Sequence, residues 1–90
     1  MFLAKVIGNV VSTKKDEGLV GCKLLILKKI DETETETGEP LVAVDNVGAG
    51  SGEIVLVITG SGARITDSGK TGPIDASIVG IVDYVEINNH

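Results

Sequence analysis

Side chains that usually supply nucleophiles, bases and metal ligands are scarce in this chain. The only histidine is His90, at the C-terminal end, where a general base or a metal ligand would be poorly positioned. The only cysteine, Cys22, lies in the apolar run Val20–Ile30, where a thiol behaves as a small hydrophobe, and no intrachain disulfide can form. A serine or cysteine nucleophile would therefore lack its usual partner. The sequence predicts no metal site and no catalytic site of these kinds.

Carboxylates are the remaining candidates for acid–base chemistry. They are scattered through the expected strands and strand ends, at Asp45, Glu53, Asp75, Asp83 and Glu86. No two of them can be given complementary roles from their spacing, and solvated or Arg64-paired groups are the simpler interpretation. An enzyme that uses them is the least supported alternative.

Two glycine-rich segments have partial likeness to phosphate-binding loops. Gly48–Gly52 would need a third glycine where Glu53 stands, and a strand is expected to follow it instead of a helix. Gly69-Lys70-Thr71 matches the end of a P-loop, but Arg64 occupies the place of the first glycine and Pro73 stands where a helix should begin. We expect no nucleotide and no other cofactor.

Composition restricts the partners further. The chain has 8 basic and 13 acidic residues, a net charge of −5, so a polyanion would be repelled on average. Its only aromatic residues are Phe2 and Tyr84, too few to build a base-stacking surface. No window approaches the roughly 18 apolar residues of a membrane span. These features predict a cytoplasmic protein that binds neither nucleic acid nor membrane.

Short β-branched runs separated by turn residues predict five strands. The second run is rich in leucine, which also suits helices, but its glycine and polar boundaries favour a strand. The segment Asp31–Pro40 alternates acids with threonine and is expected to be an exposed hairpin tip, with metal binding as an alternative. The expected strands are Leu3–Ser12, bent near Gly8, then Val20–Ile30, Leu41–Val47, Glu53–Thr59 and Ile78–Ile87.

These elements predict one all-β domain over residues 1–90. Five short strands, Gly-rich turns and no long helix indicate a small OB-like antiparallel barrel filled by aliphatic side chains. One or two short helical turns are expected, one of them at Gly60–Arg64, and Asp75 could cap a short turn before the last strand.

Three segments, taken in chain order, carry a resemblance to a known family. They are Leu3–Asp16 with Lys23-Leu24-Leu25, Val42–Gly50 continuing through Val55-Leu56-Val57 to Arg64, and Pro73–Asp83. Together they resemble the vertex protein family of bacterial microcompartments, which includes the ethanolamine-utilisation and carboxysome pentameric shell proteins. The resemblance runs nearly end to end. Ile54, in place of a common large aromatic residue, and Gly62, in place of a common serine, depart from the family pattern, and the chain ends soon after Glu86.

The resemblance implies a non-enzymatic structural protein that forms homopentamers and caps shell vertices among hexameric shell proteins. It also implies that the loop between the third and fourth strands lies at the five-fold axis, although a simple flexible hairpin loop is the alternative. Arg64 could pair with Glu53 or Asp75 of a neighbouring chain, or stay solvated or paired within its own chain. The implied axial residues are Gly48, Ala49, Gly50, Ser51 and Gly52.

A protein of another class also fits the barrel pattern. It is a monomeric OB-like binding module for a small ligand or for single-stranded nucleic acid, and the strand pattern alone supports it. The oligomeric state separates the two hypotheses, since the shell role requires a ring.

Overall fold

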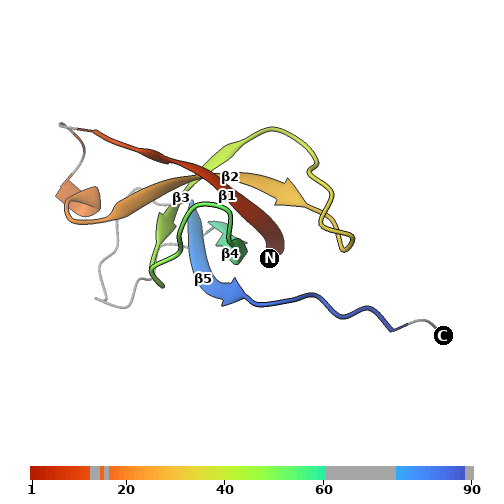
Figure 1. Cartoon of the computed structure of the whole chain (residues 1–90). Helices are drawn as coiled ribbons and strands as arrows, with labels where there is room; N and C mark the ends of the chain where they lie inside the picture. The colour runs from red at the N-terminus through yellow and green to blue at the C-terminus, as the bar shows by residue number, and fades with distance from the viewer. Residues whose placement is uncertain (13–14, 16, 61–74, 89–90) are drawn as a thin grey trace.

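Five strands and one short 3-10 turn make up the regular structure of the described chain. The computed structural model describes residues 1–12, 15, 17–60 and 75–88. The helical turn expected at Gly60–Arg64 lies outside these ranges from position 61 on. The elements are β1 (Phe2–Val10), η1 (Glu17–Leu19), β2 (Lys23–Ile30), β3 (Leu41–Asp45), β4 (Ile54–Thr59) and β5 (Ala76–Val82), arranged as Figure 1 shows.

The strands close into a barrel in the order β1-β2-β3-β5-β4, with β4 returning to β1. The predicted five-stranded all-β barrel is confirmed. The prediction of purely antiparallel pairing is wrong at one point, because β3 and β5 run parallel and share only two register pairs, Val44 with Ser77 and Asp45 with Ile78. Strand directions cannot alternate all the way around a closed ring of five, so at least one neighbouring pair must be parallel.

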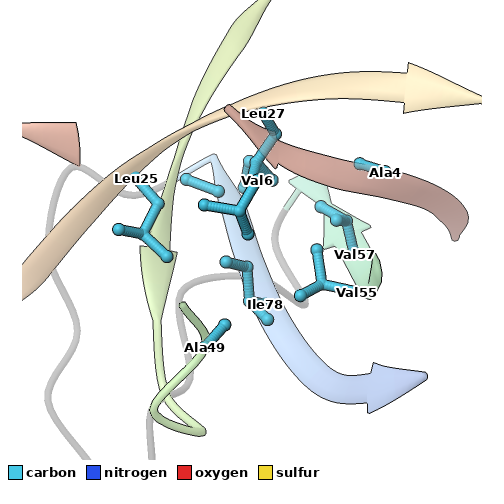
Figure 2. Packing of buried hydrophobic residues seen from close by; sticks show 10 residues of the cluster. Ala4, Val6, Leu25, Leu27, Ala49, Val55, Val57 and Ile78 are labelled. Carbon is cyan, nitrogen blue, oxygen red and sulfur yellow. The ribbon is translucent and has the colours of Figure 1, made fainter. Parts of the chain in front are cut away.

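The core is aliphatic, as the composition predicts. Along β1 and β4 buried residues alternate with more exposed ones, so Ala4 and Val6 of β1 are buried beside Val55 and Val57 of β4. Figure 2 shows Val6, Val55 and Ile78 pointing into the same interior space. Small side chains suffice because a barrel of few strands encloses little volume. The buried cluster contains Ala4, Val6, Leu25, Leu27, Ala43, Ala49, Val55, Val57, Ala76 and Ile78.

Two irregularities shape the first strands. The pairing of β1 with β2 shifts by one residue between Val6 and Gly8, where the sequence predicts a bend. The second predicted strand begins at Lys23 instead of Val20, because the preceding residues form η1 and a turn. Cys22 is half-buried in that turn and packs in a small cluster around Val44, as expected of a small hydrophobe.

The segment between β2 and β3 is an exposed hairpin tip, as predicted. Its turn is organised by Asp31, whose Oδ1 accepts the Thr33 amide at 2.8 Å, the Thr33 hydroxyl at 2.6 Å and the Thr35 amide at 3.0 Å. The Thr37 amide then donates to the Lys29 carbonyl at 2.7 Å. The four glutamates here, Glu32, Glu34, Glu36 and Glu39, are exposed, so the tip buries little surface.

The last strand is shorter than predicted. β5 ends at Val82, and the segment from Asp83 to Asn88 continues away from the barrel without regular structure (Figure 1). β-branched residues at Val85 and Ile87 suggested a longer strand, but no neighbouring strand of the described chain pairs with them. The described residues contain no helix long and apolar enough to cross a membrane.

Candidate functional site

The loop Gly48–Gly52 joins β3 to β4 at one end of the barrel. Gly48 and Gly52 have φ angles of +79° and +85°, in the left-handed region that favours glycine. The Glu53 amide donates to the Gly50 carbonyl at 3.1 Å, which closes a tight turn across the loop tip. The sequence prediction of a loop here is confirmed.

A carboxylate fixes the tip of this loop. Glu53 Oε1 accepts the Gly50 amide at 2.6 Å, so the side chain folds back over the turn that its own backbone closes. A Cβ atom added at Gly50 would lie 3.3 Å from that oxygen, which is a tight contact. Glycine at position 50 therefore allows the carboxylate to approach the backbone.

The base of the loop is joined to β1 through backbone hydrogen bonds. The Val6 amide donates to the Glu53 carbonyl and the Gly52 amide donates to the Val6 carbonyl, both at 2.9 Å. Ala49 at the other side of the tip is fully buried and belongs to the core cluster (Figure 2). Hydrogen bonds thus hold the loop at both its tip and its base.

Lys23 and Asp45 brace the start of the loop, a role that the sequence analysis missed. Asp45 Oδ1 accepts the amides of Val47 and Gly48 at 3.0 and 3.1 Å. Lys23 Nζ donates to the Ala49 carbonyl at 3.0 Å and lies 3.9 Å from Asp45 Oδ2. The Asp45 side chain is only 2% exposed. The signal available in the sequence was Asp45 directly before Asn46, since an aspartate often caps its own following backbone in such turns.

The predicted interface residues are not gathered at one place. Glu53 precedes β4, whereas Asp75 precedes β5 beside the far end of β4, where its carbonyl accepts the Gly60 amide at 3.0 Å. The two carboxylates are therefore separated by the length of a six-residue strand, about 20 Å. Arg64, their predicted partner, lies outside the described residues.

Two surface hollows lined by described residues each contain a single ionisable side chain, which does not make an acid–base pair. One, of about 200 Å³, lies beside the loop and contains Lys23 as its single ionisable side chain. Another hollow, of about 610 Å³, has Asp75 as its single ionisable side chain. No group of three potential metal ligands occurs within the described ranges. Of the scattered carboxylates, Asp45 faces Lys23 and accepts the amides of Val47 and Gly48, and Glu53 accepts the Gly50 amide, so the contacts of both carboxylates hold the loop.

The aromatic residues do not form a stacking surface on the barrel. Phe2 is half-buried against the core, and the Lys29 ammonium lies 5.1 Å from its ring centre. Tyr84 is exposed but lies in the segment beyond β5. With a net charge of −5, this arrangement does not favour the alternative of a nucleic-acid-binding module.

The fold and its braced loop define a small, closed, OB-like β-barrel. Comparison with known families is consistent with this class: the family model described as "Ethanolamine utilisation protein EutN/carboxysome" matches residues 1–83. The chain belongs to this family, and the resemblance noted in its sequence is confirmed. The family consists of structural shell vertex proteins and not of enzymes.

Individual relatives match over nearly the whole chain. The microcompartment shell vertex protein GrpN of Rhodospirillum rubrum is 52% identical over 89 residues, 99% of this chain and 100% of that protein. EutN of Escherichia coli strain K12, also named a microcompartment shell vertex protein, is 45% identical over 94% of this chain and 90% of its own length.

Solved structures of relatives share the barrel. The structure described as the GrpN pentameric microcompartment shell protein superposes with a TM-score of 0.88, covering 99% of this chain and 100% of that one. The structure of CcmL from Gloeobacter violaceus gives a TM-score of 0.91 at 42% identity, covering 99% of this chain and 92% of that one. These similarities extend through the loop and β5, so the elements that position the candidate site belong to the shared fold.

Proposed function

We propose that this chain is a structural protein that forms a homopentamer and caps the vertices of a bacterial microcompartment shell in the cytoplasm. The observation that carries the proposal is its end-to-end similarity, at 52% identity and a TM-score of 0.88, to a pentameric shell protein. A five-fold ring is a closed cyclic assembly of heterologous contacts. A layer of hexamers alone stays flat, and pentagons allow it to close.

The loop Gly48–Gly52 is proposed to line the five-fold axis. Its residues are glycine, alanine or serine, so five copies can approach one another without large side chains colliding. Glu53 and Lys23 hold the loop in one conformation, which keeps five identical contacts possible. Any opening between such loops would be narrow.

Arg64 is proposed to pair with a carboxylate of the neighbouring protomer. Of the two candidates, Asp75 is better supported, since its side chain is exposed and makes no hydrogen bond or ion pair in the described part of the chain. Glu53 already accepts the Gly50 amide within its own loop. An inter-protomer Arg–carboxylate pair would orient the contact and add modest affinity.

The partners proposed beyond the ring are hexameric shell proteins, with no nucleic acid and no membrane. Such a role needs shape complementarity and no catalytic group, which agrees with the lone ionisable residue in each of the two hollows described above. The net charge of −5 and the shortage of aromatic residues argue against nucleic acid as a partner.

Shell closure in cells tests the proposal. Hexameric shell proteins would be expressed with and without this chain, and the particles examined by electron microscopy. We expect closed polyhedral shells with the chain present and open or tubular assemblies when it is omitted. Open assemblies in both cases, with the chain recovered free of shell protein, would contradict the vertex role.

A further inference from the structure

The segment Asp83–Asn88 leaves the barrel without a partner of its own, and we call it the tail. It runs away from the strands after β5 ends (Figure 1). Its residues make no hydrogen bond or ion pair within the described part of the chain. Tyr84 is 75% exposed and Ile87 is 53% exposed. These apolar side chains gain no hydrophobic stabilisation while they are exposed in an isolated chain. Burial of the tail by another molecule would supply it.

The outer face of β1 and β4 offers an aliphatic surface. Ala4 and Val55 point inward, so the residues beside them on each strand point outward. Leu3 lies opposite Leu56 in the β1–β4 register, and both are only half-buried. Ile54, also half-buried, lies opposite Lys5. This outer face is therefore apolar at its centre.

Two lysines border this face, and neither has an ion-pair partner in the described part of the chain. Lys5 and Lys28 lie directly opposite each other in the register of β1 and β2, and like charges in that relationship are destabilising. The ion pair found among the described residues joins Lys23 to Asp45 and involves neither of them. A carboxylate brought by another molecule would relieve the repulsion between the two ammonium groups.

We propose that the tail of one protomer lies across the outer face of β1 and β4 of the next protomer. This contact deepens the proposed function and rests on the proposed ring. The tail supplies carboxylates at Asp83 and Glu86 for the two lysines, and apolar side chains for the aliphatic centre. Six extended residues reach about 20 Å, enough to cross two strands that lie about 5 Å apart.

The direction of the tail favours a neighbouring protomer over its own barrel. Val82, the last residue of β5, lies opposite Ile54 at the start of β4, and the chain continues outward from there. Reaching its own outer face would require the chain to reverse at Asp83. Each protomer offers one tail and one separate receiving face, which is the heterologous geometry that a closed ring requires.

Charge reversal in the tail tests the contact. The full-length variant D83K/E86K would be diluted in a light-scattering series and compared with E32K/E34K, which makes the same change in net charge on the hairpin tip. We expect the concentration at which half of the assembled mass is lost to rise about tenfold or more for the tail variant and to stay unchanged for the control. Equal behaviour of the two variants would overturn the proposal.

A restoring variant separates a specific contact from general destabilisation. K5E/K28E alone should weaken the ring, and K5E/K28E combined with D83K/E86K should recover at least part of the lost assembly. A change in thermal stability of D83K/E86K with no dependence on concentration would mean that the tail folds onto its own barrel, which overturns the proposal. A natural chain that is itself monomeric would overturn the ring and the proposed function, whereas an intact ring in every tail variant would overturn only this contact.

Discussion

The Glu53 carboxylate accepts the Gly50 amide at 2.6 Å, while the Glu53 amide donates to the Gly50 carbonyl at 3.1 Å. The same residue therefore binds both polar groups of Gly50 and closes the turn from two sides. The glutamate that the sequence analysis considered for contact with another chain first has a role within its own loop.

Removing that carboxylate should loosen the loop tip. Glu53→Ala is expected to lower the free energy of unfolding by about 1 kcal/mol, since one hydrogen bond to a charged acceptor is lost at an exposed site. Glu53→Gln keeps an oxygen acceptor and should lose less. Urea unfolding at a fixed protein concentration measures both. Equal stability of Glu53→Ala and the natural protein would show that the 2.6 Å contact contributes nothing.

Bulk at the loop tip should disturb the ring more than the fold. Gly50→Ala and Gly50→Val both place a Cβ 3.3 Å from the Glu53 carboxylate, so their difference isolates the two added methyl groups. If the loop lines the axis, the valine variant should lose pentamer mass at micromolar concentration, and the alanine variant should keep more of it. Identical, fully assembled masses for both variants would argue against the axial placement.

Asp45 is predicted to contribute to stability, although the sequence analysis gave it no role in the loop Gly48–Gly52. Asp45→Ala leaves the amides of Val47 and Gly48 without their acceptor, which should cost about 1–3 kcal/mol. Asp45→Asn retains an oxygen acceptor but removes the charge that faces Lys23, so its loss should be smaller. The unfolding midpoint in urea, at an unchanged denaturant slope, gives the ranking. An asparagine variant less stable than the alanine variant would contradict this account.

The hairpin tip should respond to acid in a defined direction. The Thr33 hydroxyl, followed by the Thr35 amide, lowers the pKa of Asp31 below its usual value of 3.8. A lowered pKa in the folded state means that the ionised carboxylate stabilises the turn above the unfolded pKa, and that this contribution is lost as the pH falls through the lowered value. Amide shifts of Thr33 and Thr35, followed by NMR, should titrate with a midpoint below 3.8.

The control for this titration is Asp31→Asn, in which those amide shifts should not follow a carboxyl titration. A Thr33→Val variant should move the midpoint upward, because it removes the hydroxyl that contributes most to the shift. A midpoint at or above 3.8 in the natural protein would contradict the arrangement of this turn.

Local sequence patterns were sufficient for the strands and the core. Apolar runs bounded by glycine and polar residues located all five strands, and the shortage of aromatic residues required an aliphatic interior. The irregularity near Gly8 was also visible, since glycine within a β-branched run is typical of a bulge. These features depend on residues that are close together in the sequence, so they can be predicted from one sequence.

Long-range relationships were not predictable in the same way. The parallel pairing of Val44 with Ser77 depends on how the barrel closes, and the contact of Lys23 with the loop depends on β2 and β3 being neighbours. The end of β5 at Val82 was missed because Val85 and Ile87 have strand propensity but no partner strand. The loop glycines could be identified from sequence, whereas the side chains that brace them became evident only in three dimensions.

The solution mass of the natural chain at micromolar concentration tests the central claim most directly. A chain of 9.3 kDa that assembles into a ring should scatter light as a species of five times that mass, with little material at the monomer position. A mass equal to that of one chain across the same concentration range would contradict the pentameric vertex role. It would favour the alternative of a monomeric OB-like binding module.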